Sequence, residues 1–227
     1  MSPIEVEVLL LSIRVACVTV LMCLPLGLLV AWILVRYDFP GKIIFNSIVY
    51  LPLVLPPVVV GYLMLITLGR NGFIGEWLLE TFGMTIIFSW QGAALAAFVM
   101  AFPLMVRSVR LSLESLDTGL EEAARTLGAP DWWVFLTITL PLLMPGLITG
   151  SILSFARSLG EFGATITFVG NIPGQTRTIP LALYTAIQSP DGEYAAFRLV
   201  VISLTLAFGA VICSEIIARK YSGHLRD

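Results

Sequence analysis

The sequence is poor in charged residues, and this scarcity excludes an ordinary soluble domain. Only 12% of its 227 residues are charged and 58% are hydrophobic, whereas soluble domains carry about 25% charged residues. The net charge is −2, so the overall balance gives no argument for nucleic acid as a partner. The composition therefore predicts an integral membrane protein.

Groups suited to catalysis or metal binding are also few. The sequence has one histidine, His224, which lies in a polar tail. It therefore lacks the histidines of a histidine-based zinc site and a histidine base for a hydrolase within the membrane. Three cysteines lie apart inside apolar runs, which indicates small buried side chains and not a disulfide or metal frame. The two lysines precede Ile43 and Tyr221, whereas a phosphate-binding loop needs Ser or Thr there. We therefore predict no catalytic residue, cofactor site or metal site in this chain.

Five stretches are long and apolar enough to cross a bilayer, which requires about 20 residues. They cover about residues 9–35, 43–68, 90–109, 138–159 and 197–218. We therefore predict an all-α polytopic membrane protein with about five transmembrane helices, forming one domain over residues 1–227. The acidic N-terminus and the length of the first apolar stretch argue against a cleaved signal peptide.

Prolines interrupt the second stretch, where the run LPLVLPP occupies residues 51–57. Each proline removes an amide donor, which a membrane helix tolerates only where neighbours or water satisfy the freed carbonyl. We expect this helix to be kinked or interrupted. A substrate path and a simple packing kink both remain open as the reason.

The segment EEAARTLGAPDWWVFLTITLP at 121–141 connects the third and fourth stretches. Thr118 and Glu121 fit a capping box at a helix start, and Gly128 followed by Pro130 fits a helix stop. One apolar stripe on this short helix consists of Leu120, Ala123, Ala124 and Leu127. Because so short a helix is marginal alone in water, it needs a surface to lie on, either a groove on a partner or the lipid head groups.

The same segment resembles the EAA loop of ABC importer permeases, because Glu122-Ala123-Ala124 precede Gly128 and then Ile138, Leu140 and Pro141. Two further runs, LPLVLPPVVVGY at 51–62 and SFARSLGEFGATITFVGNIPGQTRTIPLALYT at 154–185, are similar to the permease subunit of molybdate ABC importers. Sulfate and thiosulfate permeases carry a similar GEFGA and NIPG pattern. The resemblance implies that a cytoplasmic coupling loop, about residues 111–137, contacts a separate ATPase through Glu121, Glu122, Ala123, Ala124, Arg125 and Gly128.

The family resemblance also implies the partners and the transported ion. It implies a second copy of this chain, a cytoplasmic ABC ATPase dimer that binds ATP and Mg, and an extracytoplasmic oxyanion-binding protein, in a bacterial inner membrane. Molybdate, and with it tungstate, would be imported into the cytoplasm. A sulfate or thiosulfate permease, an ion-coupled secondary transporter and a membrane scaffold remain open as alternatives.

The coupling loop also sets the expected orientation. If it faces the cytoplasm, the N-terminus lies outside and the C-terminus inside. Lys and Arg are enriched in cytoplasmic connections, and this orientation places most of them there: Arg36, Lys42, Arg107, Arg110, Arg125, Arg219, Lys220 and Arg226.

Polar residues after the fourth stretch are candidates for a substrate path or gate. Arg157 and Glu161 are four positions apart, so on a helix they share a face and can pair. Charges at membrane depth are costly unless paired or hydrated, so the pair is either a functional site or a structural ion pair. Thr165, Thr167 and Asn171 add neutral donors that can replace water around an anion without trapping it.

Overall fold

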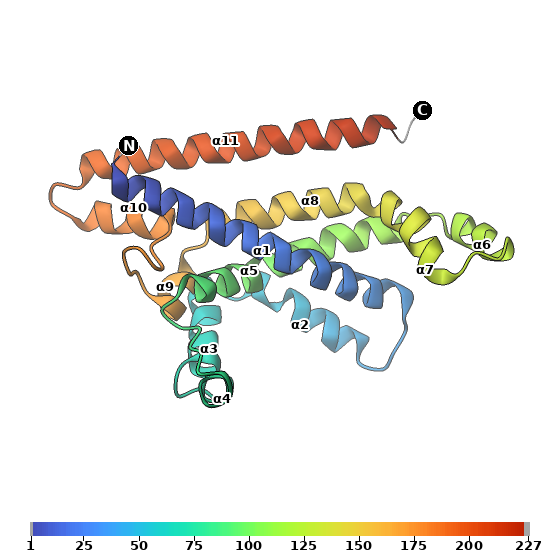
Figure 1. The fold of residues 1–227 in the computed structure, drawn as a ribbon, viewed down its shortest axis with the longest axis horizontal. Coiled ribbons are helices and arrows are strands. Elements are labelled where there is room, and N and C mark those ends of the chain that lie inside the picture. Colours follow the sequence, from blue (N-terminus) through green and yellow to red (C-terminus); the bar gives the residue numbers. More distant parts are fainter. Residues whose placement is uncertain (1, 225–227) are drawn as a thin grey trace.

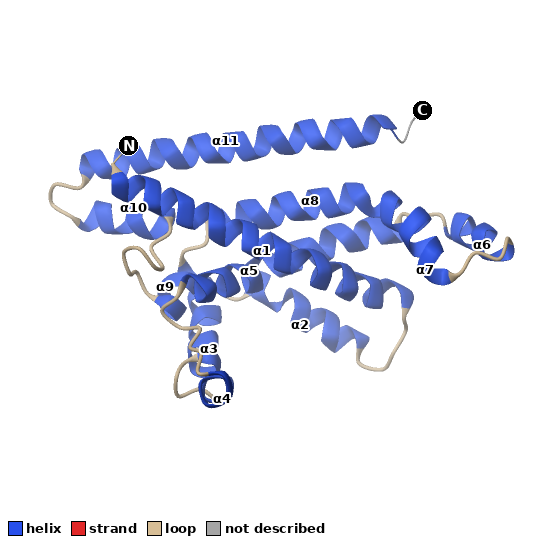
Figure 2. Ribbon diagram, in the orientation of Figure 1, coloured by secondary structure: helices blue, strands red, loops and turns tan. Residues whose placement is uncertain are grey.

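The computed structural model describes residues 2–224, without the side chains of residues 213–224, and every regular element in this part is a helix (Figure 2). Cys213, Arg219, Lys220, His224 and Arg226 therefore lie outside the described side chains. In chain order the helices are α1 (Pro3–Arg36), α2 (Lys42–Val54), α3 (Pro57–Leu68), α4 (Phe73–Phe82), α5 (Trp90–Glu114), α6 (Thr118–Thr126), α7 (Asp131–Val134), the π-helical turn η1 (Phe135–Thr139), α8 (Leu140–Leu159), α9 (Gly163–Val169), α10 (Ile179–Gln188) and α11 (Glu193–His224).

Helices α1, α5 and α8 pack side by side and form the centre of the molecule (Figure 1). Small residues allow this close approach: Ala97 and Ala101 of α5 are fully buried, and a Cβ on Gly150 of α8 would lie 2.6 Å from Met105 Sδ. Lipid chains are as apolar as leucine, so packing at small residues is what holds such helices together. The small residues of the third and fourth apolar stretches thus serve helix packing.

The second apolar stretch is interrupted, as its prolines predict. Helices α2 and α3 are separated at Leu55 and Pro56 and are bent by 116° relative to each other. The bend carries α3 onto α9, where a Cβ on Gly61 would lie 2.6 Å from the carbonyl oxygen of Ala164. The broken helix therefore contacts the segment that follows α8.

By length and composition, four helices among the described residues could cross a membrane, or five if the α2–α3 pair forms one span. Several helices run beyond the predicted stretches. Helix α1 starts at Pro3, because Ser2 and Glu5 cap it reciprocally, and α5 continues to Glu114. The fourth span is preceded by helical turns from Asp131 onward, so the loop between α5 and α8 is mostly helical.

Candidate functional site

Helix α6 lies at one end of the bundle, beyond the ends of α5 and α8 (Figure 1). Its N-cap is Asp117, whose carboxylate accepts a hydrogen bond of 2.9 Å from the Gly119 amide. The predicted capping box of Thr118 and Glu121 is therefore wrong. The N-cap lies one residue before Thr118, and the Glu121 side chain bonds to Arg36 and Thr139 instead of capping the helix.

The predicted stop at Gly128 is confirmed. Gly128 has a φ of +87°, its amide donates to Arg125 (2.9 Å), and the Ala129 amide donates to Ala124 (3.1 Å). These two bonds are the Schellman pattern, which needs a left-handed residue, and glycine adopts that conformation without steric cost.

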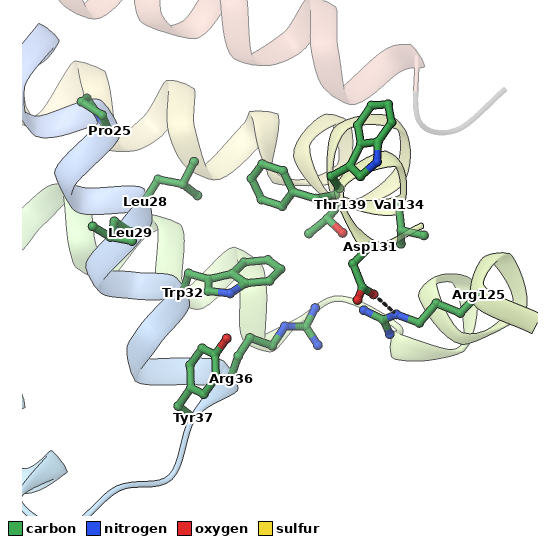
Figure 3. Close-up of a pocket in the computed structure, with 12 residues that line it drawn as sticks. Pro25, Leu28, Leu29, Trp32, Arg36, Tyr37, Arg125, Asp131, Val134 and Thr139 are labelled. Atoms are coloured by element: carbon green, nitrogen blue, oxygen red, sulfur yellow. Dashed lines mark hydrogen bonds and ion pairs between the residues drawn. The ribbon is translucent and has the colours of Figure 1, made fainter. Parts of the chain in front are cut away.

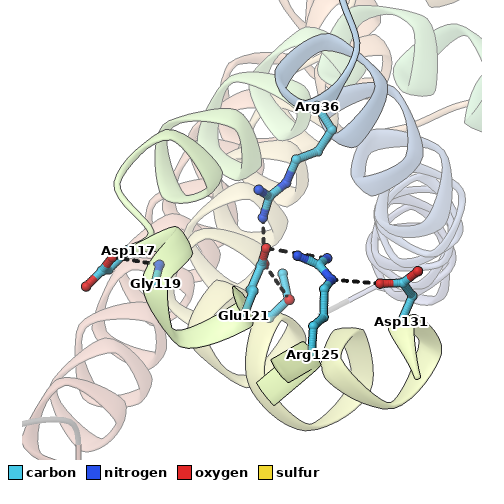
Figure 4. Close-up of polar contacts among 7 residues, drawn as sticks. Arg36, Asp117, Gly119, Glu121, Arg125 and Asp131 are labelled. Atoms are coloured by element: carbon cyan, nitrogen blue, oxygen red, sulfur yellow. Dashed lines mark hydrogen bonds and ion pairs between the residues drawn. The ribbon is translucent and has the colours of Figure 1, made fainter. Parts of the chain in front are cut away.

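A buried carboxylate holds α6 against its own chain (Figure 4). Glu121 is 3% exposed. Its Oε1 atom accepts hydrogen bonds from Arg36 Nη2 at 2.5 Å and from Thr139 Oγ1 at 2.7 Å. Arg36 ends α1 and Thr139 ends η1, directly before α8. One carboxylate thus connects α6 to both helices, and we call this contact the Glu121 tie.

Arg125 closes the other side of the Glu121 tie. Its guanidinium lies 4.0 Å from the second oxygen of Glu121 and donates to Asp131 at 2.8 Å. The hydrogen bond that Arg125 donates to Asp131 raises the pKa of Arg125, so this cation keeps its charge throughout the physiological range. The contact links α6 to the first residue of α7.

Another side of α6 is exposed and apolar. Leu120 is 52% exposed and Leu127 is 89% exposed, and Glu122 is exposed on a different side of the same helix. A nine-residue helix with its apolar stripe in water is marginal. The face is therefore available to a partner, and the Glu121 tie sets its direction.

The residues predicted for coupling thus divide into two groups. Glu122, Ala123, Arg125 and Gly128 are exposed and Ala124 is half-buried, whereas Glu121 is buried within the chain.

Arg36 and Thr139 were not predicted to belong to this site. They are separated from Glu121 by 85 and 18 positions, and the sequence carries no signal for these pairings. The structure does show a π-helical turn that ends at Thr139, and such turns occur often at functional sites.

Arg157 and Glu161 form the predicted ion pair, but they do not lie on one helix. Helix α8 ends at Leu159, and Glu161 lies in the turn before α9. Arg157 Nη1 is 2.6 Å from Glu161 Oε2, while Glu161 Oε1 accepts from the Ala164 amide at 2.8 Å. Glu161 is 2% exposed, so the pair joins the end of α8 to the start of α9 in a buried position.

The remaining path candidates lie on α9 and in the loop after it. Thr165 is buried, and the Thr167 hydroxyl donates to a carbonyl of its own helix. Asn171 donates to Thr185 at 2.7 Å and accepts from Arg177 at 2.8 Å, so it attaches the loop to α10. Of the five candidates, only Arg157 and Glu161 bond to each other through their side chains.

The interrupted helix and the buried carboxylate meet at the start of α9. A Cβ on Gly163 would lie 2.8 Å from the Pro57 side chain, so α3 begins directly against this turn. The proline break therefore contacts Gly163, which follows Glu161 by two residues in the sequence. Among the described residues, no group of three His, Cys, Asp or Glu side chains could hold a metal ion.

Comparison with known proteins reveals extensive similarity along the chain. Residues 23–223 match the model of the family described as binding-protein-dependent transport system inner membrane component. The molybdenum transport system permease protein ModB of Escherichia coli is 61% identical over 95% of this chain and 94% of that protein. A sulfate transport system permease protein of Synechocystis sp. is 38% identical over 94% of this chain and 77% of that protein.

Solved structures share the fold at low sequence identity. The MetNI methionine ABC transporter, in inward-facing conformations, gives a TM-score of 0.74 at 20% identity, covering 97% of this chain and 99% of that chain. A bacterial alginate ABC transporter in complex with a periplasmic protein gives 0.78 at 18% identity, with 97% and 80% covered. The predicted all-helical ABC permease fold is confirmed, and the chain belongs to the family of binding-protein-dependent transport system inner membrane components.

Proposed function

We propose that this chain is the membrane-spanning permease subunit of an ATP-driven importer that carries molybdate, and with it tungstate, into the cytoplasm. The observation that carries the proposal is the 61% identity to a molybdenum permease along almost the whole chain, against 38% for a sulfate permease. Tungstate is included because it has nearly the size and charge of molybdate. The chain itself is not an enzyme, since its relatives are permease subunits.

The ATPase partner follows from the exposed face of α6. This face presents Leu120 and Leu127 to solvent, and Glu122 is exposed on a different side of the helix. Such an exposed helix suits a groove on a cytoplasmic ABC ATPase that binds ATP and Mg. One chain carries one such helix, and an ATPase dimer needs two. A second copy of this chain is the simplest source of the other.

The third partner is an extracytoplasmic oxyanion-binding protein that delivers the ion. The family description names binding-protein-dependent transport, and a similar alginate importer was solved with its periplasmic protein.

The proposed location of the protein is the bacterial inner membrane, with the N-terminus outside and the C-terminus in the cytoplasm. Arg36, Arg110 and Arg125 lie at or near the end of the bundle that carries α6, whereas the N-terminus is at the other end (Figure 1). In the sequence, the segments connecting the apolar stretches on the α6 side carry Arg36, Lys42, Arg107, Arg110 and Arg125, whereas those on the other side carry Arg70 and Arg177, which supports placing the α6 end in the cytoplasm.

Motion of the ATPases can be transmitted through α8 to the segment that follows it, which contains Glu161 and α9. The Glu121 tie links α6 to Thr139, directly before α8, which has 20 residues and is therefore about 30 Å long. Arg157 lies near the far end of α8 and pairs with Glu161. We assign Arg157 and Glu161, with Thr165, Thr167 and Asn171, to the path or gate near the outside. Coupling then requires that the ATPases bind the two conformations with different affinity.

Uptake into membrane vesicles tests the proposal. We expect molybdate uptake that needs the ATPase and ATP hydrolysis, is inhibited by tungstate, and is inhibited much less by sulfate. Uptake that continues without ATP hydrolysis would instead indicate an ion-coupled transporter. Equal competition by sulfate would indicate a sulfate or thiosulfate permease, and absence of uptake under every condition would indicate a scaffold.

A further inference from the structure

A pocket of about 720 Å³ lies between α1 and the segment formed by α6, α7 and η1 (Figure 3). Its walls on the α1 side extend from Pro25 to Arg36. Eleven residues of helix correspond to about 16 Å, which is close to half of a hydrocarbon core about 30 Å thick. The pocket therefore has the depth of one leaflet, measured from the end of the bundle that carries α6.

The chemistry of the pocket changes along this depth. Pro25, Leu28 and Leu29 line its inner part, and Arg36, Arg125 and Asp131 line its outer end. In the proposed orientation, the charged end lies at the level of the cytoplasmic head groups and the apolar part lies in the cytoplasmic leaflet. This is the polarity of a lipid molecule.

Arg36 and Arg125 present guanidinium groups at the charged end: their side chains are 23% and 46% exposed, and both line the pocket. Arg36 Nη2 donates to Glu121 and Arg125 Nε donates to Asp131, so each guanidinium keeps further N–H donors. A phosphate oxygen is a strong acceptor for a guanidinium.

The charges around this end balance each other. Arg36 and Arg125 are cations, and Glu121 and Asp131 are anions. The side chain of Asp131 is 84% exposed, so its carboxylate can also meet a cationic group outside the protein. A ligand that carries one negative and one positive charge fits this mouth better than a net anion.

We propose that the pocket holds one zwitterionic phospholipid of the cytoplasmic leaflet, a phosphatidylethanolamine. Its phosphate accepts from the exposed guanidinium nitrogens of Arg36 and Arg125, its ammonium lies near Asp131, and an acyl chain lies along Pro25, Leu28 and Leu29. The bound phosphate then lies beside the Glu121 tie and stabilises Arg36 in the position that holds α6. This consequence for coupling rests on the proposed function, whereas the binding itself does not.

Native mass spectrometry of the purified permease–ATPase complex, titrated with phosphatidylethanolamine, tests the binding. We expect one saturable lipid per permease chain, bound at least tenfold more tightly than a diacylglycerol with the same acyl chains. Leu29→Trp fills the apolar part of the pocket and should weaken binding at least tenfold. Leu26→Trp is the matched control: it adds the same bulk to an exposed position of α1 outside the pocket and should leave the affinity unchanged.

Three results would overturn the inference. Diacylglycerol could bind as tightly as the phospholipid, Leu29→Trp could keep the full affinity, or the complex could bind no lipid because the ATPase or the second permease copy covers the pocket. The same spectra report whether the variant complexes are intact, and Leu29→Phe replaces Leu29→Trp if the larger side chain prevents assembly. Since neither ATP nor molybdate is needed, a failure here is distinguishable from a failure of the transport proposal.

Discussion

Replacing Arg36 with Met should release α6 from the bundle and uncouple ATP hydrolysis from transport. The substitution keeps the apolar stem of the side chain and removes its charge. The Glu121 side chain, 4% exposed, then keeps only the Thr139 hydroxyl at 2.7 Å and Arg125 at 4.0 Å. An unpaired charge in this position favours opening of α6 toward water.

The size of the effect follows from burial. Removing one partner of a buried ion pair costs about 3–5 kcal/mol. Arg36 is itself 23% exposed and Arg125 can move closer, so we expect the lower end, about 3 kcal/mol. At 1.4 kcal/mol for each factor of ten, the open population of α6 rises by about 150-fold.

The reverse substitution should cost less. Glu121→Leu leaves Arg36, which can reach water or a head group, so the loss is about 1.5 kcal/mol, the low end for a hydrogen bond to a charged group. The double variant with Arg36→Met and Glu121→Leu removes both charges. It should therefore be more stable than Arg36→Met alone.

Two measurements check these values. Hydrogen exchange of the α6 amides, followed by mass spectrometry, reports the local opening free energy. The number of molybdate ions transported per ATP in proteoliposomes reports coupling. This number should be lowest in the variant with the lowest opening free energy of α6. Glu114→Ala is the control, because it breaks a half-exposed i,i+4 pair with Arg110 and should change α6 protection by less than about 0.5 kcal/mol.

The reasoning would be refuted if Arg36→Met left α6 protection and coupling unchanged, or if the double variant were as strongly affected as the sum of the two single variants. Either result would mean that the Glu121 tie does not hold α6 in place.

Three other substitutions test separate parts of the molecule. Glu122→Lys reverses an exposed charge on α6 and should abolish ATPase stimulation without reducing the yield of folded permease; normal coupling would contradict the docking of α6 in a groove that encloses Glu122. Gly128→Ala places a side chain at a φ of +87°, so it should destabilise the end of α6 by about 1–2 kcal/mol, measured as faster amide exchange there, with unchanged exchange arguing against the αL requirement. Arg157→Ala leaves the buried carboxylate of Glu161 unpaired and should reduce molybdate uptake more than complex assembly, whereas an equal loss of both would indicate a structural ion pair.

Much of the fold could be predicted from local patterns. The apolar stretches, the proline break before α3 and the glycine stop after α6 all depend on residues that are close in sequence. Helix ends were less accurate, as α5 continues to Glu114 and the cap of α6 is Asp117. Several residues near these ends are compatible with more than one boundary, so the final turn depends on which side chain finds a partner.

The candidate site was predicted in part. The apolar stripe of α6 and the pairing of Arg157 with Glu161 follow from spacing, although Glu161 proved to lie beyond the end of its helix. The network around Asn171 could not be foreseen, because Arg177 and Thr185 are ordinary polar residues of a loop and a helix until the fold brings them together.

The sequence alone determined the class of the protein, since composition and apolar length decide how a chain meets a bilayer, and the spacing of 121–141 indicated an importer permease. The tertiary structure decided which of two neighbouring carboxylates is buried: Glu121 faces inward to Arg36 and Thr139, while Glu122 is exposed. Consecutive positions on a helix differ by about 100° in direction, so only the packing of α6 against α1 and η1 determines which carboxylate is buried. That packing joins residues 85 positions apart, and no local pattern in the sequence encodes it.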